Sequence, residues 1–318
     1  MRKYLTRASF LLAFAFFASF HLNAQVKWMN VDDQFQPLPT NFHVYKTNDS
    51  LDGKPFIAYY SIAKLKDKQL GFTVDTSKSR RLIPSIFFER NDHPLLVVNC
   101  TFFSYETNRS INVVIRDGKM LEFNRHTIPM RGKDTFQYMH PLVSAIGIDK
   151  KRKADIAWTY TDSTKNFAYL TELNRFAIKD SFTTIPFDRT QSFKKWKVKT
   201  AVGGGPVLVQ NGRVQVTNEE EWKFTGKAIN DKHPRTCMGY TKDGYLIIMA
   251  IQGRFPGVAE GATLNQEAQL LKDLGCVEAL NLDGGGSSCM LINGKETIKP
   301  SEKAGQRPVP AVFLIKNQ

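Results

Sequence analysis

Residues 277–292 read VEALNLDGGGSSCMLI and place a glycine-rich loop between two short apolar runs. The two runs, 277–282 and 289–292, are typical of buried strands. Three successive glycines let the backbone approach a ligand closely and turn several amides toward one point, which favours an anion-binding concavity. A dinucleotide-binding loop would be followed by a helix, so the second strand argues against that kind of site. A glycine-rich tight turn without a ligand is the structural alternative.

Side chains at both edges of this loop are candidates for chemistry. Asp283 precedes the glycines, and the hydroxyl groups of Ser287 and Ser288 follow them. Together with the backbone amides of Gly284 and Gly285, the two serines predict a site for an anionic group such as phosphate. Asp283 is the first candidate catalytic carboxylate.

Strands dominate the rest of the chain. Runs rich in β-branched and aromatic residues predict strands at 56–64, 70–74, 94–103, 111–115, 154–160, 183–187, 199–205, 206–210, 213–216, 237–240, 245–252 and 309–315. A helix is expected from 264 to 274, because Thr263 and Gln266 form a capping box and Gly275 supplies a stop. A second, shorter helix is indicated within 79–90. This pattern predicts an α+β fold, a largely antiparallel or mixed β-sheet with a few packed helices in a single large domain.

The chain divides into three parts. Residues 1–24 carry basic side chains, then an apolar run over 10–20, and end on a small residue, Ala24, as a secretory signal does. The run is shorter than the roughly 20 residues of a spanning helix, so we expect no membrane span. Cleavage near Ala24 predicts a periplasmic or secreted protein. Residues 25–54 form a polar entry segment, and 55–318 form the main domain.

The composition is that of a basic globular protein. The 318 residues include 44 basic and 30 acidic side chains, a net charge of +14, and 42% of them are hydrophobic. Residues 1–24 hold three of the basic side chains and no acidic one, so their removal leaves +11. This excess favours anionic partners. The lysines are scattered without interleaved aromatic residues, so we expect a glycan or sugar phosphodiester as partner and no nucleic acid.

The four cysteines allow two interpretations. Cys100, Cys237, Cys276 and Cys289 each lie in or beside an apolar stretch, where a small buried thiol packs well. In an oxidising compartment they could also form one or two disulfides, with three complete pairings. The sequence leaves both open. No cysteine pair or histidine cluster indicates a zinc site.

Glu267 is the second candidate catalytic carboxylate. On a helical wheel it falls within the apolar face that includes Leu264, Ala268 and Leu271. Burial without a partner raises the pKa of a carboxyl group, as in a general acid, whereas a facing arginine would keep it ionised. The alternative is a first-turn glutamate that complements the helix dipole from the edge of the stripe. Both interpretations stay open.

Five residues elsewhere are candidates for binding substrate or phosphate. Arg235 and Arg254 lie at the two ends of a predicted hairpin, and guanidinium groups suit phosphate by bidentate hydrogen bonding. Gly204 and Gly205 join two strands where the backbone comes close to another group, or where a bulge lies. Asn99 ends a buried strand, and its amide either satisfies a neighbouring loop or points into a pocket.

Short motifs follow one another in a fixed order along the chain. They are Asn99-Cys-Thr-Phe-Phe103, Gly203-Gly-Gly-Pro206, Pro234-Arg-Thr236, Gln252-Gly-Arg254, the helix with Glu267, Asn281 to Ser288, and Arg307-Pro-Val309. In this order they resemble the phosphodiester glycosidase family, over about residues 55–316. The stretch 281–288 is the most specific. Where many members have glycines after the asparagine, this chain has Cys100 and Thr101, which leaves the substrate open.

The resemblance implies hydrolysis of the bond between an anomeric carbon and a phosphodiester oxygen, in a GlcNAc-1-phosphodiester-like substrate or phosphorylated glycan. A phosphate monoester leaves with little protonation, so neutralisation by Arg235, Arg254 and loop amides should count for more than a strong acid. A carboxylate, Asp283 or Glu267, would stabilise the oxocarbenium-like centre or activate water. No cofactor is expected, because the ligand count does not indicate a divalent cation at Asp283 and Asn99.

Two other function classes compete with this interpretation. A non-catalytic protein would grip an anionic exopolysaccharide with the same loop and arginines. A serine hydrolase with Ser287 or Ser288 as nucleophile ranks lower, because the chain lacks a Gly-x-Ser-x-Gly elbow and an obvious triad histidine.

Overall fold

The structure is a computed structural model that describes residues 26–183 and 193–318. The expected secretory signal lies outside the described residues, as does most of the strand expected at 183–187. Within the described ranges, no helix is long and apolar enough to cross a membrane.

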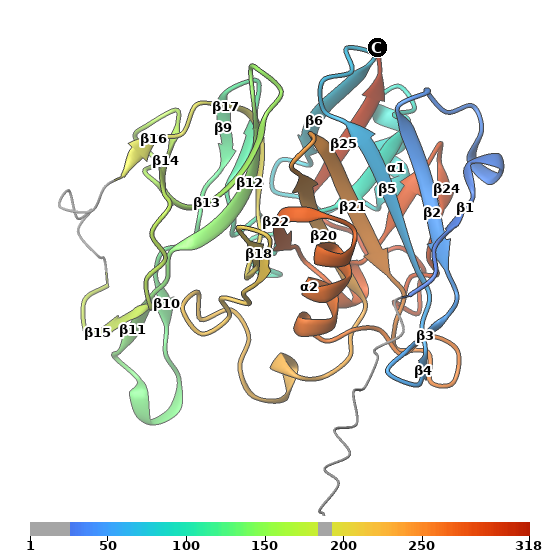
Figure 1. The fold of residues 1–318 in the computed structure, drawn as a ribbon. Helices are drawn as coiled ribbons and strands as arrows, with labels where there is room; N and C mark the ends of the chain where they lie inside the picture. Colours follow the sequence, from blue (N-terminus) through green and yellow to red (C-terminus); the bar gives the residue numbers. More distant parts are fainter. Residues whose placement is uncertain (1–25, 184–192) are drawn as a thin grey trace, which may run out of the picture.

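Two sheets form the centre of the molecule (Figure 1). The eight-stranded sheet has the order β1 (Met29–Asn30), β2 (Phe42–Thr47), β5 (Ala58–Lys64), β21 (Tyr245–Ile251), β20 (Arg235–Thr241), β22 (Cys276–Asn281), β18 (Val207–Gln210), β19 (Arg213–Val214). The five-stranded sheet has the order β24 (Lys295–Glu296), β23 (Met290–Ile292), β7 (Leu96–Asn99), β25 (Ala311–Asn317), β6 (Leu70–Thr76).

Three further sheets lie around this centre. The seven-stranded sheet has the order β16 (Lys194–Lys195), β14 (Ala168–Thr171), β13 (Ala154–Thr161), β12 (Val143–Asp149), β17 (Val198–Gly203), β8 (Val114–Arg116), β9 (Lys119–Glu122). The small sheets are β10 (Ile128–Pro129), β11 (Tyr138–His140), β15 (Ile178–Asp180), and β3 (Ser50–Leu51), β4 (Lys54–Pro55). The α-helices are α1 (Pro84–Arg90) and α2 (Leu264–Asp273); 3-10 turns are η1 (Asp32–Phe35), η2 (Gly132–Asp134), η3 (Gly226–Ile229) and η4 (Gly285–Ser287).

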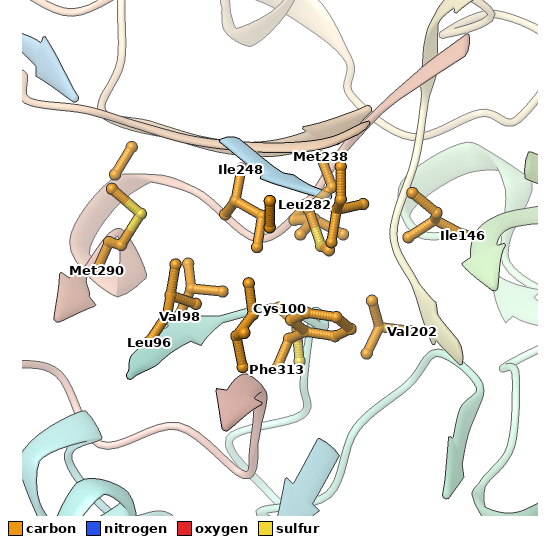
Figure 2. Packing of buried hydrophobic residues seen from close by; sticks show 14 of the residues in the cluster. Leu96, Val98, Cys100, Ile146, Val202, Met238, Ile248, Leu282, Met290 and Phe313 are labelled. Atoms are coloured by element: carbon orange, nitrogen blue, oxygen red, sulfur yellow. The ribbon is translucent and has the colours of Figure 1, made fainter. Parts of the chain in front are cut away.

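The largest core lies between the eight-stranded and five-stranded sheets. Figure 2 shows Met238 and Ile248 of the first sheet above Val98 and Phe313 of the second. Ile146, from the seven-stranded sheet, packs against the same core, so this third sheet closes one side of it. Burial of this apolar surface is the main favourable term that holds the sheets together.

The outer faces of the two central sheets are covered by the α-helices. Residues of β21 alternate between the central core, as Ile248 does, and a second core under α2, as Ile247 and Met249 do. The strand is therefore buried on both faces, which explains its uninterrupted apolar sequence. On the five-stranded sheet, α1 packs Phe87 against residues such as Leu314.

The expectations from sequence are met for most strands, with the boundaries displaced by a few residues. The turn at Asn211-Gly212 joins β18 and β19 as expected, with positive φ at both residues, which type I′ turns require. Every strand pairing among the described residues is antiparallel. Because these residues contain only two short α-helices beside many strands, the fold is mainly β. The expected "few packed helices" therefore overstated the helical content. The entry segment contributes β2, which pairs with β5 along its whole length.

The central core supplies a test of stability. Phe313 is 2% exposed, and its replacement by alanine would leave a cavity between the two sheets. We expect Phe313→Ala to lower the free energy of unfolding by about 3–5 kcal/mol, measured by urea denaturation. Phe176, which is 65% exposed, is the matched control, and Phe176→Ala should change it by less than about 0.5 kcal/mol. Equal effects of the two substitutions would contradict this account of the core.

Candidate active site

The glycine-rich loop connects the two central sheets. It leaves the eight-stranded sheet at the end of β22, Asn281, and enters the five-stranded sheet at the start of β23, Met290. The loop is therefore not a hairpin turn, because the flanking strands lie in different sheets and do not pair with each other. The 3-10 turn η4, at 285–287, was not predicted from sequence.

Backbone hydrogen bonds hold the loop against both sheets. Asp283 N donates to Cys100 O at 2.8 Å, just beyond β7, and Gly285 N donates to Pro234 O at 2.8 Å, just before β20. A Cβ atom at Gly284 would lie 2.8 Å from that same Pro234 carbonyl oxygen. Glycine is needed there because the loop backbone packs directly on another backbone.

The side chain of Asn99 ties the loop to its surroundings. Its Nδ2 donates to Asp283 O at 2.6 Å, and its Oδ1 accepts from Thr236 Oγ1 at 2.9 Å and Cys289 N at 3.0 Å. Asn99 is fully buried at the end of β7. Of the two interpretations from sequence, the structure therefore bears out the one in which the amide satisfies a neighbouring loop. Asn99 positions the backbone on either side of the glycines.

Asp283 is partly buried beside two cationic side chains. Burial raises the pKa of its carboxyl group to about 6, against the opposing effects of the Ser287 side chain and the positive charges of Arg307 and Lys223. The Ser288 hydroxyl is buried and has no hydrogen-bond partner within the described residues. The loop therefore presents a carboxylate that ionises near neutral pH and is surrounded by positive charge.

Two arginines flank the glycines. A Cβ atom at Gly285 would lie 3.0 Å from Arg254 Nη2, and one at Gly286 would lie 2.2 Å from Arg307 Nη2, so both guanidinium groups lie against the loop backbone. Arg307 is held by Glu302, with Nε 2.8 Å from Oε2. Arg254 is exposed. Guanidinium groups beside loop amides form a surface suited to phosphate oxygens.

Arg235 and Glu267 lie on the face of the eight-stranded sheet that α2 covers. Arg235 is 2% exposed, and its Nε donates to Ala262 O at 3.0 Å. Glu267 is fully buried, and neither carboxyl oxygen has a hydrogen-bond partner in the described part of the chain. Burial raises the pKa of Glu267 to about 7, against the opposing effects of the Arg235 charge and the Cys237 thiol. Glu267 is therefore buried, with a raised pKa that the charge of Arg235 lowers only in part.

Arg235 interacts electrostatically both with Glu267, under α2, and with Arg254, beside the glycine-rich loop. Both Arg235 and Arg254 lower the pKa of His233, after the larger effect of burial, and the positive charge of Arg254 lowers the pKa of Arg235. Arg235 and Arg254, predicted from the two ends of one hairpin, are therefore near each other. Glu267 raises the pKa of Arg235, whereas the pKa of Asp283 responds to Ser287, Arg307 and Lys223. The two carboxylates thus occupy different surroundings.

The Gly203–Pro206 segment packs against the strand that leads into the loop. Gly205 N donates to Asn281 O at 2.8 Å, and a Cβ atom at Gly204 would lie 2.4 Å from that oxygen. The close approach expected for Gly204 and Gly205 is therefore an approach to β22. Gly204 O accepts a hydrogen bond of 2.8 Å from Lys223 Nζ, which brings this lysine to the site.

Sequence reasoning missed Lys223 and did not assign a role to Arg307. Burial lowers the pKa of Lys223 to about 8, although the negative charges of Glu221 and Asp283 oppose this effect. Lys223 lies in a polar stretch without a recognisable motif, so no sequence signal marked it. Arg307 stood in the Arg-Pro-Val motif, which was a usable signal.

The cysteines and the possible metal ligands are the other groups that the sequence raised. All four cysteines are buried and unpaired. No group of three or more His, Cys, Asp or Glu side chains that could hold a metal ion occurs among the described residues.

The loop thus brings a carboxylate, Asp283, together with two cationic side chains, Lys223 and Arg307. The family model for phosphodiester glycosidases matches residues 92–316, well over half of the chain. The chain therefore belongs to the phosphodiester glycosidase family, a family of glycosidase-type hydrolases, as its motifs predicted.

Individual relatives are more distant. The chain is 31% identical over 103 residues to N-acetylglucosamine-1-phosphodiester α-N-acetylglucosaminidase of Mus musculus, covering 30% of this chain and 20% of the mouse protein. It is 40% identical over 88 residues to the SPβ prophage-derived uncharacterized protein YomE of Bacillus subtilis (strain 168), covering 28% of this chain and 13% of that protein. The matched stretches thus span a fifth or less of these curated relatives.

Solved structures share the fold. The catalytic domain of zebrafish N-acetylglucosamine-1-phosphodiester α-N-acetylglucosaminidase, auto-inhibited by its pro-peptide, has a TM-score of 0.59 at 16% identity, covering 92% of this chain and 89% of that one. A hypothetical protein from Synechocystis has a TM-score of 0.58 at 15% identity, covering 86% and 62%. These likenesses extend the family's fold over nearly all of the described chain.

The buried carboxyl of Glu267 predicts a pH dependence of stability. Its pKa is about 7 in the folded protein and 4.5 ordinarily, so the folded state holds this proton more tightly. The free energy of unfolding should therefore fall as pH rises from about 4.5 to 7. Asp283 contributes a slope of the same sign up to about pH 6, whereas His126, whose pKa burial lowers to about 4, contributes a slope of the opposite sign up to about pH 6.5, so the Glu267 contribution is read from the difference between wild type and variant.

Glu267→Gln should flatten this slope between about pH 6 and 7, measured by urea denaturation at a series of pH values. Glu106→Gln, at an exposed position, serves as the control and should keep the wild-type slope. An unchanged slope in Glu267→Gln would show that this carboxyl does not titrate as described.

Proposed function

We propose that this protein is an exported hydrolase that cleaves the glycosidic bond of a sugar-1-phosphodiester, either GlcNAc-1-phosphodiester-like or part of a phosphorylated glycan. The observation that carries the proposal is the placement of Asp283, a partly accessible carboxylate beside Lys223 and Arg307. Membership of the phosphodiester glycosidase family supports the reaction type. The names of the mammalian relatives support a GlcNAc-1-phosphodiester as the first substrate to try.

The proposed reaction breaks the bond between the anomeric carbon and the phosphodiester oxygen. The bonding electrons leave with the phosphate monoester, and the oxygen of a water molecule bonds to the anomeric carbon. Arg254 and Arg307, with the amides of the glycine loop, would neutralise the charge of the leaving phosphate. Both guanidinium groups lie against Gly285 and Gly286, and Glu302 holds Arg307 by a hydrogen bond of 2.8 Å, which favours such stabilisation.

Asp283 would act in its ionised form. It either stabilises the positive charge that develops at the anomeric carbon or takes a proton from the attacking water. Glu267 is the second candidate carboxylate. Its position next to Arg235, in a fully buried environment, favours a role through that arginine, by holding its charge where substrate phosphate can meet it. Gly204, Gly205 and Asn99 would contribute by keeping the loop and Lys223 in place.

We also propose export, with cleavage near Ala24, to the periplasm or the outside of the cell. The basic start of the chain and the apolar run over 10–20 support this destination. There the excess of basic side chains would favour anionic glycans, and nucleic acid is not an expected partner.

The role of Asp283 can be tested by hydrolysis of α-GlcNAc-1-phosphodiesters and related sugar phosphodiesters. We expect Asp283→Asn to reduce kcat by about 100-fold or more, because it removes a charge that acts on the transition state. Asp33→Asn, at an exposed position of η1, is the matched control and should retain wild-type turnover. If wild-type and Asp283→Asn proteins both bind these compounds without turning any of them over, the protein is a binding module for anionic exopolysaccharide.

Arg254 provides a separate test of phosphate recognition. We expect Arg254→Ala to raise KM for a sugar phosphodiester by about tenfold or more, because hydrogen bonds to charged groups contribute about 1.5–3 kcal/mol. Increasing salt should weaken binding less in the variant than in the wild-type protein. Arg213→Ala, in the exposed hairpin of β19, is the control. An unchanged KM in Arg254→Ala would remove this arginine from the phosphate site.

A further inference from the structure

A cavity of about 170 Å³ lies beside Lys223, lined among others by Phe102, Phe224 and Arg125. The reaction proposed above gives it no role. We infer that this cavity binds the glycosyl unit of the substrate, a single pyranose ring, with Lys223 donating hydrogen bonds to its hydroxyl groups. This inference rests on the proposed function and deepens it, since it says which end of the phosphodiester lies on which side of Asp283.

The cavity is connected to the catalytic loop through Lys223. The ammonium group of Lys223 hydrogen bonds to Gly204 O at 2.8 Å, and the charges of Lys223 and Asp283 act on each other. Arg254 and Arg307 lie instead against the glycines that follow Asp283. A substrate with its phosphate on the arginines and its scissile bond at Asp283 would therefore direct its sugar toward Lys223.

The walls have the chemistry that a sugar ring requires. The rings of Phe102 and Phe224 have centroids 5.9 Å apart and meet edge to face, and they offer apolar surface to the C–H groups of a pyranose. Lys223 Nζ lies 3.7 Å from the centre of the Phe102 ring. The Lys223 ammonium group has three N–H donors. One of them donates a hydrogen bond to Gly204 O, and the others can donate to sugar hydroxyls.

Residues 221–224, which form one wall of the cavity, are held in place by hydrogen bonds. Asn218 holds Phe224 by two reciprocal hydrogen bonds of 2.9 Å between its amide and the Phe224 backbone. The buried carboxylate of Glu221 accepts hydrogen bonds from Ser144, Thr217, Trp158 and the amide of Val207. Because these hydrogen bonds are made within the chain, they hold this segment in place independently of a sugar, which favours affinity. Figure 1 shows the segment, in gold, below β18.

The size of the cavity favours one ring over a chain of sugars. Pockets for drug-sized ligands hold about 300–1,000 Å³, and this cavity is smaller. The phosphate group is the alternative occupant of this cavity, and it would bind to the cationic side chains of Lys223 and Arg125. The experiment therefore separates sugar from phosphate.

Binding of methyl α-N-acetylglucosaminide, methyl α-glucoside and inorganic phosphate would be measured one at a time by ligand-observed NMR and calorimetry, which need no turnover. Phe224→Leu removes the ring and keeps an apolar side chain, and Lys223→Met removes the charge and keeps the length. We expect both to weaken a methyl glycoside about tenfold and inorganic phosphate less than twofold. Arg254→Ala should do the reverse, and Phe176→Leu, at an exposed position, should change neither.

Each outcome decides the inference. Loss of phosphate binding with unchanged glycoside binding in Phe224→Leu and Lys223→Met would overturn it, as would a wild-type protein that hydrolyses sugar phosphodiesters but binds neither methyl glycoside. Glycoside binding that depends on Phe224, in a protein that hydrolyses no sugar phosphodiester, would support the sugar site while the proposed reaction fails. Thermal unfolding of each variant verifies that it folds.

Discussion

The site depends on the hydrogen bonds that the side-chain amide of Asn99 makes. This amide joins β7 of the five-stranded sheet to Thr236 on β20 of the eight-stranded sheet, and to the backbone of Asp283 and Cys289 on either side of the glycines. These groups are buried, so an unmade hydrogen bond there would cost the full desolvation of a polar group. The loop that carries the carboxylate is thus fixed at the seam between two sheets, where core packing holds both sides.

The seam also explains why the loop is rich in glycine. The chain must pass from one sheet to the other within a few residues while touching Pro234 backbone on one side and Arg307 on the other. A Cβ atom at Gly284 or Gly286 would meet these groups at 2.8 Å or less. The glycines therefore serve packing and chemistry together: the space that they leave is what lets guanidinium groups lie against backbone amides.

Much of this arrangement could be predicted from sequence, because its signals are local. The strand, loop and strand around Asp283 and the capped helix with Glu267 follow from periodicity and turn chemistry within short windows. The joining of two sheets by the loop and the approach of Lys223 depend on contacts between distant segments, which periodicity does not encode. The two helices expected at 264–274 and within 79–90 are present as α2 and α1, but they are short beside the many strands, so the term α+β overstated the helical content.

The two candidate carboxylates, Asp283 and Glu267, lower the stability of the folded chain at neutral pH. Burial raises the pKa of both Asp283 and Glu267, so at neutral pH the folded chain bears the cost of carboxylates that water would solvate better. Arg235 offsets part of this cost for Glu267, and Lys223 with Arg307 offsets part for Asp283. In the proposed reaction the substrate phosphate would meet Arg307, and Lys223 would lie on the sugar side. The two central cores supply the stability that offsets the cost of the buried carboxylates.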